Sequence, residues 1–130
     1  MYSVHMKARK MLLDGLVDLG IIKKRLSEKK KTELINRFFP HSIGHHLGLD
    51  VHDPVFWGYG KKTAKMPLPV NSVVTIEPGL YFQSEDETLP KEIRGIGIRL
   101  ENTVHVKKDK SDEIKTGFSL EPDFIENVLS

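Results

Sequence analysis

Four histidines and two aspartates lie within thirteen residues, in the segment HSIGHHLGLDVHD that runs from His41 to Asp53. The chain has six histidines in all and no cysteine, so this segment holds most of its imidazole. Neutral imidazole nitrogen is a ligand of divalent first-row metals, and it also serves in acid–base chemistry. Taken alone, a histidine is more often a hydrogen-bonded polar residue than a ligand. The segment by itself therefore leaves both interpretations open.

Two glutamates in strand-like sequence add carboxylate oxygens that such a metal would also accept. Glu77 lies in TIEPGLY beside Ile76, and Glu101 lies in GIRLEN, where the alternate residues are apolar. A carboxylate that is buried on a sheet needs a cation or an ion-pair partner. Arg99 lies two residues before Glu101 and on the same strand face, so it could supply the pair. These residues indicate either a His/Glu/Glu site for Mn, Co, Zn or Fe or ordinary charges on a surface strand.

The elements that would position these residues follow from the periodicity of the sequence. Residues 2–19 have apolar residues at helical spacing, and Gly20 is a suitable C-terminal stop. Further along the chain we expect a short helix over 27–37, a loop over 54–69, a strand over 70–77 that ends at Pro78-Gly79, a polar connection over 84–93, a strand over 95–108, a polar loop, and a short helix over 121–130. Helices followed by strands favour an α+β fold with an antiparallel sheet.

The bulk composition is that of an ordinary globular chain. Its 130 residues suffice for one domain with its own core, and 38% hydrophobic and 29% charged residues are typical of globular proteins. No apolar run approaches the ~20 residues of a membrane span, and no apolar segment follows the basic N-terminal residues as a signal peptide would require. The absence of cysteine excludes disulfides and suits a reducing compartment. We therefore expect a cytoplasmic protein with no membrane partner.

The basic run from Lys23 to Lys31 raises nucleic-acid binding as a hypothesis. The net charge is only +2, however, and no aromatic residue interleaves with the lysines to stack on bases. The run is better explained as a solvated turn that leads into the second helix. We expect no nucleic-acid partner.

Three motifs occur in order along the chain: HSIGHHLGLDVHD, TIEPGLYF and GIGIRLENTV. Together they resemble the C-terminal half of the catalytic domain in the aminopeptidase P and Xaa-Pro dipeptidase (prolidase) family of metallopeptidases, and the resemblance extends over nearly the whole chain. It implies half of a pita-bread fold, in which an antiparallel sheet has flanking helices. It also implies hydrolysis of Xaa-Pro peptide bonds by a metal-bound hydroxide.

The resemblance implies three metal ligands. His45 matches the ligand histidine of the G-H-x-L-G-L-D-V-H-D pattern, Glu77 matches a ligand that also shuttles a proton, and Glu101 matches a carboxylate that bridges two metals. The complete site would hold two divalent cations, which the resemblance implies are Mn²⁺, with Co²⁺ or Zn²⁺ as substitutes. The neighbouring His46, where the family often has an aromatic residue, is expected to pack beside the site without binding metal.

The remaining matches concern substrate and orientation. His41 and His52 match histidines that contact substrate and stabilise the transition state, and Arg99 matches an arginine that orients a ligating carboxylate. With Glu77, these are the expected catalytic residues. The implied substrate is a peptide with proline at its second position. The sequence does not separate an aminopeptidase that acts on longer peptides from a dipeptidase.

The family's site has two further aspartate ligands from sequence that precedes this region, and no aspartate of this chain follows their strand pattern. We therefore expect residues 1–130 to be the C-terminal portion of a catalytic domain that is truncated at its N-terminus and inactive in isolation. The apolar surface left by the missing half predicts association with that N-terminal half, or self-association. The alternative is a non-catalytic pita-bread module that binds peptides or proteins.

Overall fold

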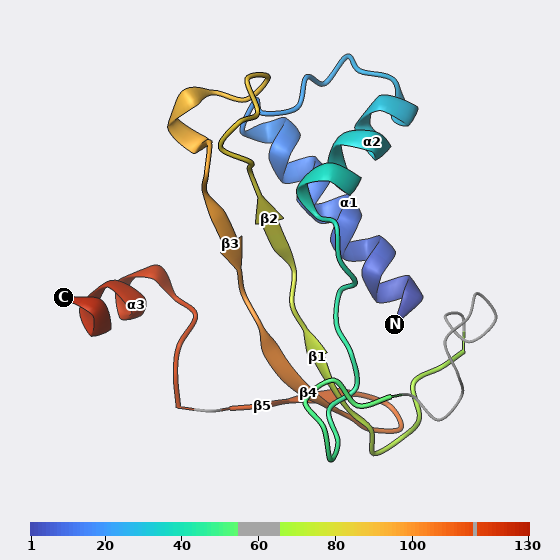
Figure 1. The fold of residues 1–130 in the computed structure, drawn as a ribbon. Helices are drawn as coiled ribbons and strands as arrows, with labels where there is room; N and C mark the ends of the chain where they lie inside the picture. The colour runs from blue at the N-terminus through green and yellow to red at the C-terminus, as the bar shows by residue number, and fades with distance from the viewer. Residues whose placement is uncertain (55–65, 116) are drawn as a thin grey trace.

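The computed structural model describes residues 1–54, 66–115 and 117–130 and has an α+β architecture (Figure 1). Two helices come first, α1 (Tyr2–Asp18) and α2 (Glu28–Phe38), and the strands follow them. The later elements are β1 (Val73–Ile76), β2 (Gly79–Tyr81), the 3₁₀ helix η2 (Lys91–Ile93), β3 (Gly97–Arg99), β4 (Asn102–Val106), β5 (Ser111–Ile114) and α3 (Pro122–Leu129). Helices, then strands, then a final helix is the order that the sequence predicts.

Local signals place the ends of the helices. Ser27 is the N-cap of α2, and its hydroxyl accepts a hydrogen bond from Lys30 N at 3.3 Å. After α1, Gly20 adopts a left-handed φ of 74° and its N–H donates to Val17 O at 3.0 Å. Pro122 occupies the first turn of α3, where its missing N–H is harmless. The three predicted helices are thus confirmed to within a residue at each end.

The basic run forms a turn and the first half of α2. Lys30 pairs with Glu33 at 3.1 Å, and Lys31 pairs with Glu28 at 2.8 Å, both within the same helix. Pairs of this spacing are ordinary features of a solvated helix surface. Within the described residues, no helix combines the length and apolar character that a bilayer crossing requires.

Two antiparallel strand pairs share one register. Ile76 of β1 lies opposite Asn102 of β4, and Gly79 of β2 lies opposite Arg99 of β3. On both sides of the ladder, two residues lie between these pairs, so the register is the same before and after the interruption. Pro78 lies in the interruption and has no N–H to donate. The single strand predicted over 95–108 is wrong in this respect, because the chain is divided there into β3 and β4. The strand predicted over 70–77 is likewise shortened to β1, and β2 follows it.

A third strand extends the β1–β4 pair at residues predicted to be a polar loop. β5 pairs antiparallel with β4, and Glu113 lies opposite Val104. Asp and Glu are poor strand formers, so the sequence SDEI carries little local signal. The prediction was wrong here because pairing with β4 outweighs local propensity. Of the loop predicted over 54–69, residues 55–65 lie outside the described part of the chain.

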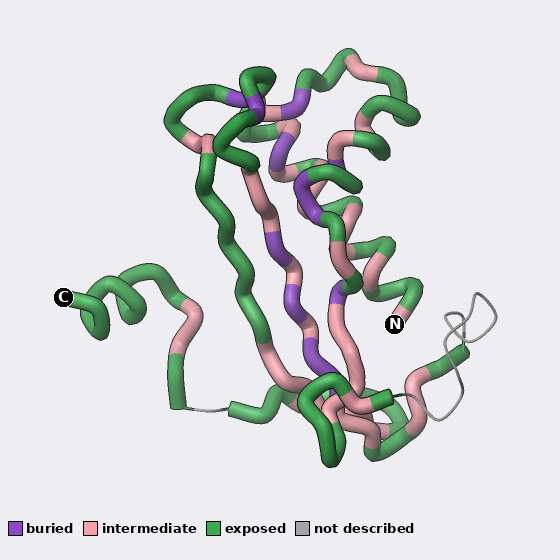
Figure 2. The backbone as a smooth tube through the Cα atoms, in the orientation of Figure 1, coloured by how far each residue is buried: buried purple, intermediate pink, exposed green. Residues whose placement is uncertain are grey.

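The core lies between the two long helices and one face of the strands (Figures 1 and 2). Ile76 and Leu80 of the strands pack against it, so the alternate residues Glu77 and Tyr81 project from the other face. The buried members of this cluster are Leu16, Ile22, Ile35, Phe38, Phe39, Ile43 and Leu89. One face of the sheet is thus occupied by the core and the other is left for polar chemistry.

The strand β3 is exposed along its whole length, as Figure 2 shows. Its apolar residue Ile98 is 60% exposed, and the following Leu100 is 42% exposed. The helix α3 likewise has no buried residue, although its sequence has an apolar side. The described chain therefore has apolar surface that its own core does not cover.

Candidate metal centre

The segment 43–47 runs beside β1 and brings the histidines to the sheet. Three backbone hydrogen bonds of 2.7–3.0 Å join the two antiparallel stretches: Glu77 N to Ile43 O, Thr75 N to His45 O, and Leu47 N to Val73 O. Gly44 permits this approach, because a Cβ at that position would lie 1.9 Å from Thr75 O. The close contact places His45 beside the end of β1.

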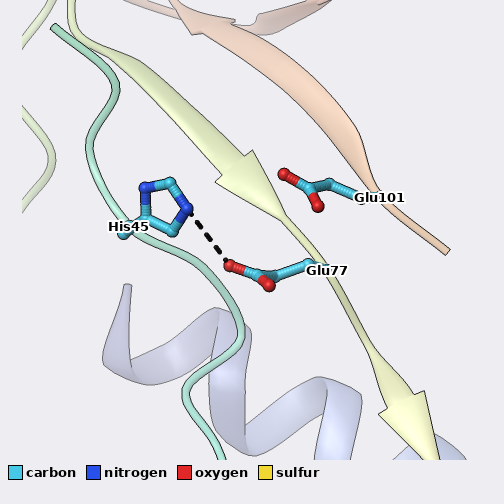
Figure 3. Close-up of side chains that lie close together, drawn as sticks. All are labelled: His45, Glu77 and Glu101. Atoms are coloured by element: carbon cyan, nitrogen blue, oxygen red, sulfur yellow. Dashed lines mark ion pairs between the residues drawn. The ribbon is translucent and has the colours of Figure 1, made fainter. Parts of the chain in front are cut away.

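Three donor side chains meet where the ladder is interrupted (Figure 3). Each of His45, Glu77 and Glu101 offers one ligand atom, and these atoms lie within 4.8 Å of one another. The shortest approach that the structure gives is 3.5 Å, between His45 Nε2 and Glu77 Oε1. Donors that each lie ~2.1 Å from one ion are at most ~4.2 Å apart. A contraction of about half an ångström would therefore let all three residues contact one cation.

The hydrogen bonding of His45 suits a metal ligand. Its Nδ1 lies 2.9 Å from His46 O, and because a carbonyl can only accept, Nδ1 carries the proton. The other nitrogen, Nε2, lies 3.5 Å from Glu77 Oε1, and in the neutral imidazole it has the lone pair that a metal ion would accept. His46 itself is half-buried, and its backbone bridges to Val74 and Asp53. Burial lowers the pKa of His46, which favours the neutral form of this ring, and its expected place beside the site stays a prediction.

His52 is exposed and lies next to His45, with 4.3 Å between the ring centroids. The turn that carries it is closed by Asp53, whose Oδ2 accepts from Asp50 N at 3.4 Å. Gly48 allows the turn to close, because a Cβ there would lie 2.3 Å from the same carboxylate oxygen. Asp53 is therefore a structural residue that holds His52 beside the centre.

Tyr81 joins two of the expected site residues, and the sequence analysis missed it. Its hydroxyl lies 3.0 Å from His41 Nε2 and 2.6 Å from Arg99 Nε. His41 Nδ1 donates to Ser42 O at 2.7 Å, so Nε2 accepts from Tyr81 while Arg99 donates to the same hydroxyl. Arg99 also places Nη1 3.5 Å from Glu77 Oε2. The available signal was spacing, because Tyr81 lies four residues after Glu77 on the same strand face.

The charges of the centre are not balanced by its own residues. Two carboxylates, Glu77 and Glu101, meet one guanidinium, Arg99. The hydrogen bond to Tyr81, with these carboxylates nearby, raises the pKa of Arg99 above its ordinary value. One negative charge remains uncompensated, and together with the imidazole and carboxylate donors this favours a divalent cation. The structure thus brings five of the six expected site residues to one place and links the sixth, His41, through Tyr81.

Comparison with known sequences places the chain in a family of metallopeptidases. A sequence model of metallopeptidase family M24 matches residues 1–108. The Xaa-Pro aminopeptidase of Haemophilus influenzae is 35% identical over 116 residues, which cover 89% of this chain and 26% of that protein. Human Xaa-Pro aminopeptidase 3 is 35% identical over 115 residues, which cover 88% of this chain and 22% of that protein. The chain spans about a quarter of the length of these relatives.

Comparison with solved structures agrees with the fold. Escherichia coli aminopeptidase P with the inhibitor Pro-Leu superposes with a TM-score of 0.77 and 27% identity, over 99% of this chain and 33% of that one. The zinc-substituted form of the same enzyme in complex with product gives a TM-score of 0.77 over the same shares. This likeness confirms the expected fold class, an α+β chain that forms part of a pita-bread fold.

Proposed function

The chain belongs to metallopeptidase family M24, and from this premise we propose that it is the C-terminal part of a catalytic domain that hydrolyses Xaa-Pro peptide bonds. The observation that carries the proposal is the convergence of His45, Glu77 and Glu101 within 4.8 Å at the interruption in the ladder. The substrate class is supported by relatives that are named Xaa-Pro aminopeptidases. Such substrates are peptides with proline at the second position.

We assign the cation site to His45, Glu77 and Glu101. A bound divalent cation would supply Lewis-acid polarisation of the scissile carbonyl and would lower the pKa of a water molecule. Imidazole and carboxylate donors suit Mn²⁺, Co²⁺ and Zn²⁺, and we favour Mn²⁺. These three side chains suffice for one ion with open positions, whereas a pair of ions needs further oxygen ligands from polypeptide outside them.

Glu77 is the residue to which we assign proton transfer. It is 8% exposed, and its two oxygens face different partners, Oε1 toward His45 and Oε2 toward Arg99. The ionised carboxylate is the form that accepts a proton. From this position the carboxyl group can pass the proton to the leaving amine, the role of a general acid–base. Arg99, which Tyr81 orients, acts through Glu77.

The two flanking histidines receive different roles. Both ring nitrogens of His41 are engaged, one with Ser42 O and one with the Tyr81 hydroxyl, so this ring has no free donor for an oxyanion. His52 is exposed beside His45, and we assign to it the hydrogen bond that stabilises the developing oxyanion. His41 contacts Phe39 edge-on at 4.8 Å, and we assign its ring to the wall that receives the apolar proline.

We propose that the complete activity requires further polypeptide. The exposed apolar residues Ile98 and Leu100 on and beside β3 support a covering partner, as does a chain that spans 33% of the length of E. coli aminopeptidase P. The partner we propose is the N-terminal half of the same catalytic domain, which would supply the remaining oxygen ligands. Self-association is the alternative.

The test is reconstitution with a matching N-terminal half. The folded complex, loaded with Mn²⁺, should cleave a peptide that begins Xaa-Pro. Glu77→Gln preserves the shape of the side chain and should abolish turnover, whereas Glu92→Gln, an exposed residue of η2, should leave turnover unchanged. A folded, loaded complex without peptidase activity would contradict the catalytic proposal. Full activity of Glu77→Gln would remove Glu77 from the mechanism.

The second candidate is a non-catalytic module that binds peptides on the same fold. The exposed apolar surface at Ile98 and Leu100 favours it, because such surface is typical of binding sites. The convergence of the three donors favours hydrolysis instead, because a binding module has no need of it. The reconstituted complex separates the two: peptide binding without turnover in the Mn²⁺-loaded protein would favour the module.

A further inference from the structure

Thr75 lies between two of the proposed metal ligands. It is 2% exposed and precedes Glu77 by two residues, so the two side chains share one face of the strand. The Thr75 hydroxyl accepts a hydrogen bond from His45 N at 3.0 Å and donates one to Glu77 Oε1 at 3.2 Å. One hydroxyl group therefore connects the backbone of one ligand to the carboxylate of another.

From this geometry we propose that Thr75 is a positioning residue that holds the Glu77 carboxylate and the His45 backbone in the arrangement that binds the cation. The inference rests on the metal centre of the proposed function and adds a residue that makes no contact with the metal. It predicts that removing one oxygen atom, without changing shape, weakens cation binding.

The direction of each hydrogen bond follows from the chemistry of the groups. The His45 N–H can only donate, so the Thr75 oxygen accepts from it and keeps its own proton for a second partner. An ionised carboxylate can only accept, so that proton is directed to Glu77 Oε1. The Thr75 N–H also donates to His45 O at 2.9 Å, so two hydrogen bonds join these residues. Together they set the spacing between segment 43–47 and β1.

The position of the Glu77 carboxylate depends on few contacts. Besides Thr75, it faces His45 Nε2 and Arg99 Nη1, each at 3.5 Å, which is long for a hydrogen bond. The bond from Thr75 is the one within ordinary reach, and it is charge-assisted and buried, so it is stronger than a neutral pair in water. Threonine branches at Cβ, which restricts its χ1 rotamers. The direction of its hydroxyl group is therefore well defined. Oε1 has a second lone pair, which remains available to the cation.

Three variants separate the hydroxyl from the shape of the side chain. Thr75→Val keeps the shape and removes the hydroxyl, and Thr75→Ser keeps the hydroxyl and removes a methyl group. Thr103→Val is the matched control, because Thr103 lies opposite Thr75 in the β1–β4 pair and, within the described residues, is hydrogen-bonded through its side chain to neither His45 nor Glu77. Mn²⁺ affinity is measured by titration calorimetry and Co²⁺ affinity by visible absorption. The affinities are compared only between variants whose Tm equals that of the wild type, so that unfolding does not contribute to the difference.

Thr75→Val should weaken Mn²⁺ and Co²⁺ affinity by roughly 10- to 100-fold, the usual effect of losing a residue that orients a ligand. Thr75→Ser should restore most of that affinity, and Thr103→Val should equal the wild type. Wild-type affinity in Thr75→Val, or equal losses in the serine and valine variants, would overturn the inference. A wild-type chain that binds neither ion would overturn the metal centre itself and, with it, the role of Thr75.

Hydrogen exchange gives a second measurement that needs no metal, and its readout in the wild type needs no variant. The His45 amide donates to the Thr75 hydroxyl, so in the wild type it should exchange at least 10-fold more slowly than the same amide in an unfolded peptide. In Thr75→Val this protection should fall selectively, while the Thr75 amide, which donates to His45 O, keeps its own. An unprotected His45 amide in the wild type would overturn the inference.

Discussion

Replacing Gly44 with alanine should separate the histidine segment from β1. The added Cβ would lie 1.9 Å from Thr75 O and 2.7 Å from Thr75 C. Both are backbone atoms, so no rotation of a side chain relieves the contact. A normal van der Waals separation requires the two stretches of backbone to move apart by about 1.5 Å. Because His45 is the next residue, the displacement acts directly on the candidate metal centre.

The expected loss of stability in Gly44→Ala follows from the three backbone hydrogen bonds between segment 43–47 and β1. Each is 2.7–3.0 Å long, and a shift of about 1.5 Å would break most of them. At a net contribution of about 1 kcal/mol each, Gly44→Ala should lower the free energy of unfolding by roughly 3 kcal/mol. For a domain of this size, that corresponds to a fall in Tm on the order of 10 °C. Mn²⁺ affinity should fall as well, because His45 moves away from Glu77.

Thermal and urea unfolding, followed by circular dichroism, test this prediction, and Gly15→Ala is the control. Gly15 lies inside α1, and a Cβ there would meet nothing within 4 Å. Alanine at this position should therefore raise the free energy of unfolding by roughly 0.5–1 kcal/mol through helix propensity. Glycine-to-alanine substitution should thus lower the free energy of unfolding at Gly44 and raise it at Gly15. Wild-type stability and Mn²⁺ affinity in Gly44→Ala would refute the reasoning.

Three further perturbations probe the frame around the centre. Leu16→Ala in the core should lower the free energy of unfolding by about 2–5 kcal/mol, whereas Leu16→Met should cost less than about 1.5 kcal/mol. Asp86 is buried and paired with Arg37, so a double-mutant cycle of Asp86→Asn and Arg37→Met should give a coupling energy of about 1 kcal/mol or more, and additive losses would contradict the pair. Burial, and next the charge of Arg9, lower the pKa of His5 from its ordinary 6.5. Below about pH 6.5 the unfolded chain therefore binds more protons than the folded chain, so the free energy of unfolding should fall from pH 7 toward pH 5. Measured by urea unfolding, this pH dependence should be weaker in His5→Leu.

The helices were the part of the fold that the sequence predicted best, because capping and terminating residues close in sequence determine where each helix begins and ends. Ser27 caps a helix, Gly20 ends one and Pro122 begins one, and each acts within a few residues of its own position. The strand β5 was missed because nothing local favours extended backbone at Asp112 and Glu113. Their conformation is set by pairing with β4, which lies outside any short window of sequence.

For the candidate site, the sequence indicates which residue types could bind a metal. It does not indicate which side chains contact one another. His45, Glu77 and Glu101 stand out as donors in any list of metal-binding side chains. Tyr81 and Thr75 do not, because hydroxyl residues are common in strands. Their importance appears only when the register places them on the face that carries Glu77 and when distances show which groups they join. Sequence reasoning therefore finds candidate metal ligands more readily than the residues that would position them.

The interruption in the ladder explains why the centre lies where it does. Because the registers of β1–β4 and β2–β3 agree, an unbroken ladder would set Glu77 directly opposite Glu101, and like charges in that arrangement are unfavourable. Pro78 cannot donate to a ladder, so the chain leaves regular pairing at the same point, and Leu100 N retains only a 3.2 Å bond to Pro78 O. A divalent cation held by Glu77 and Glu101 would replace this repulsion with attraction. The two carboxylates that disfavour regular strand pairing would therefore favour cation binding, and a bound ion should stabilise the fold as the concentration of the ion rises above its dissociation constant.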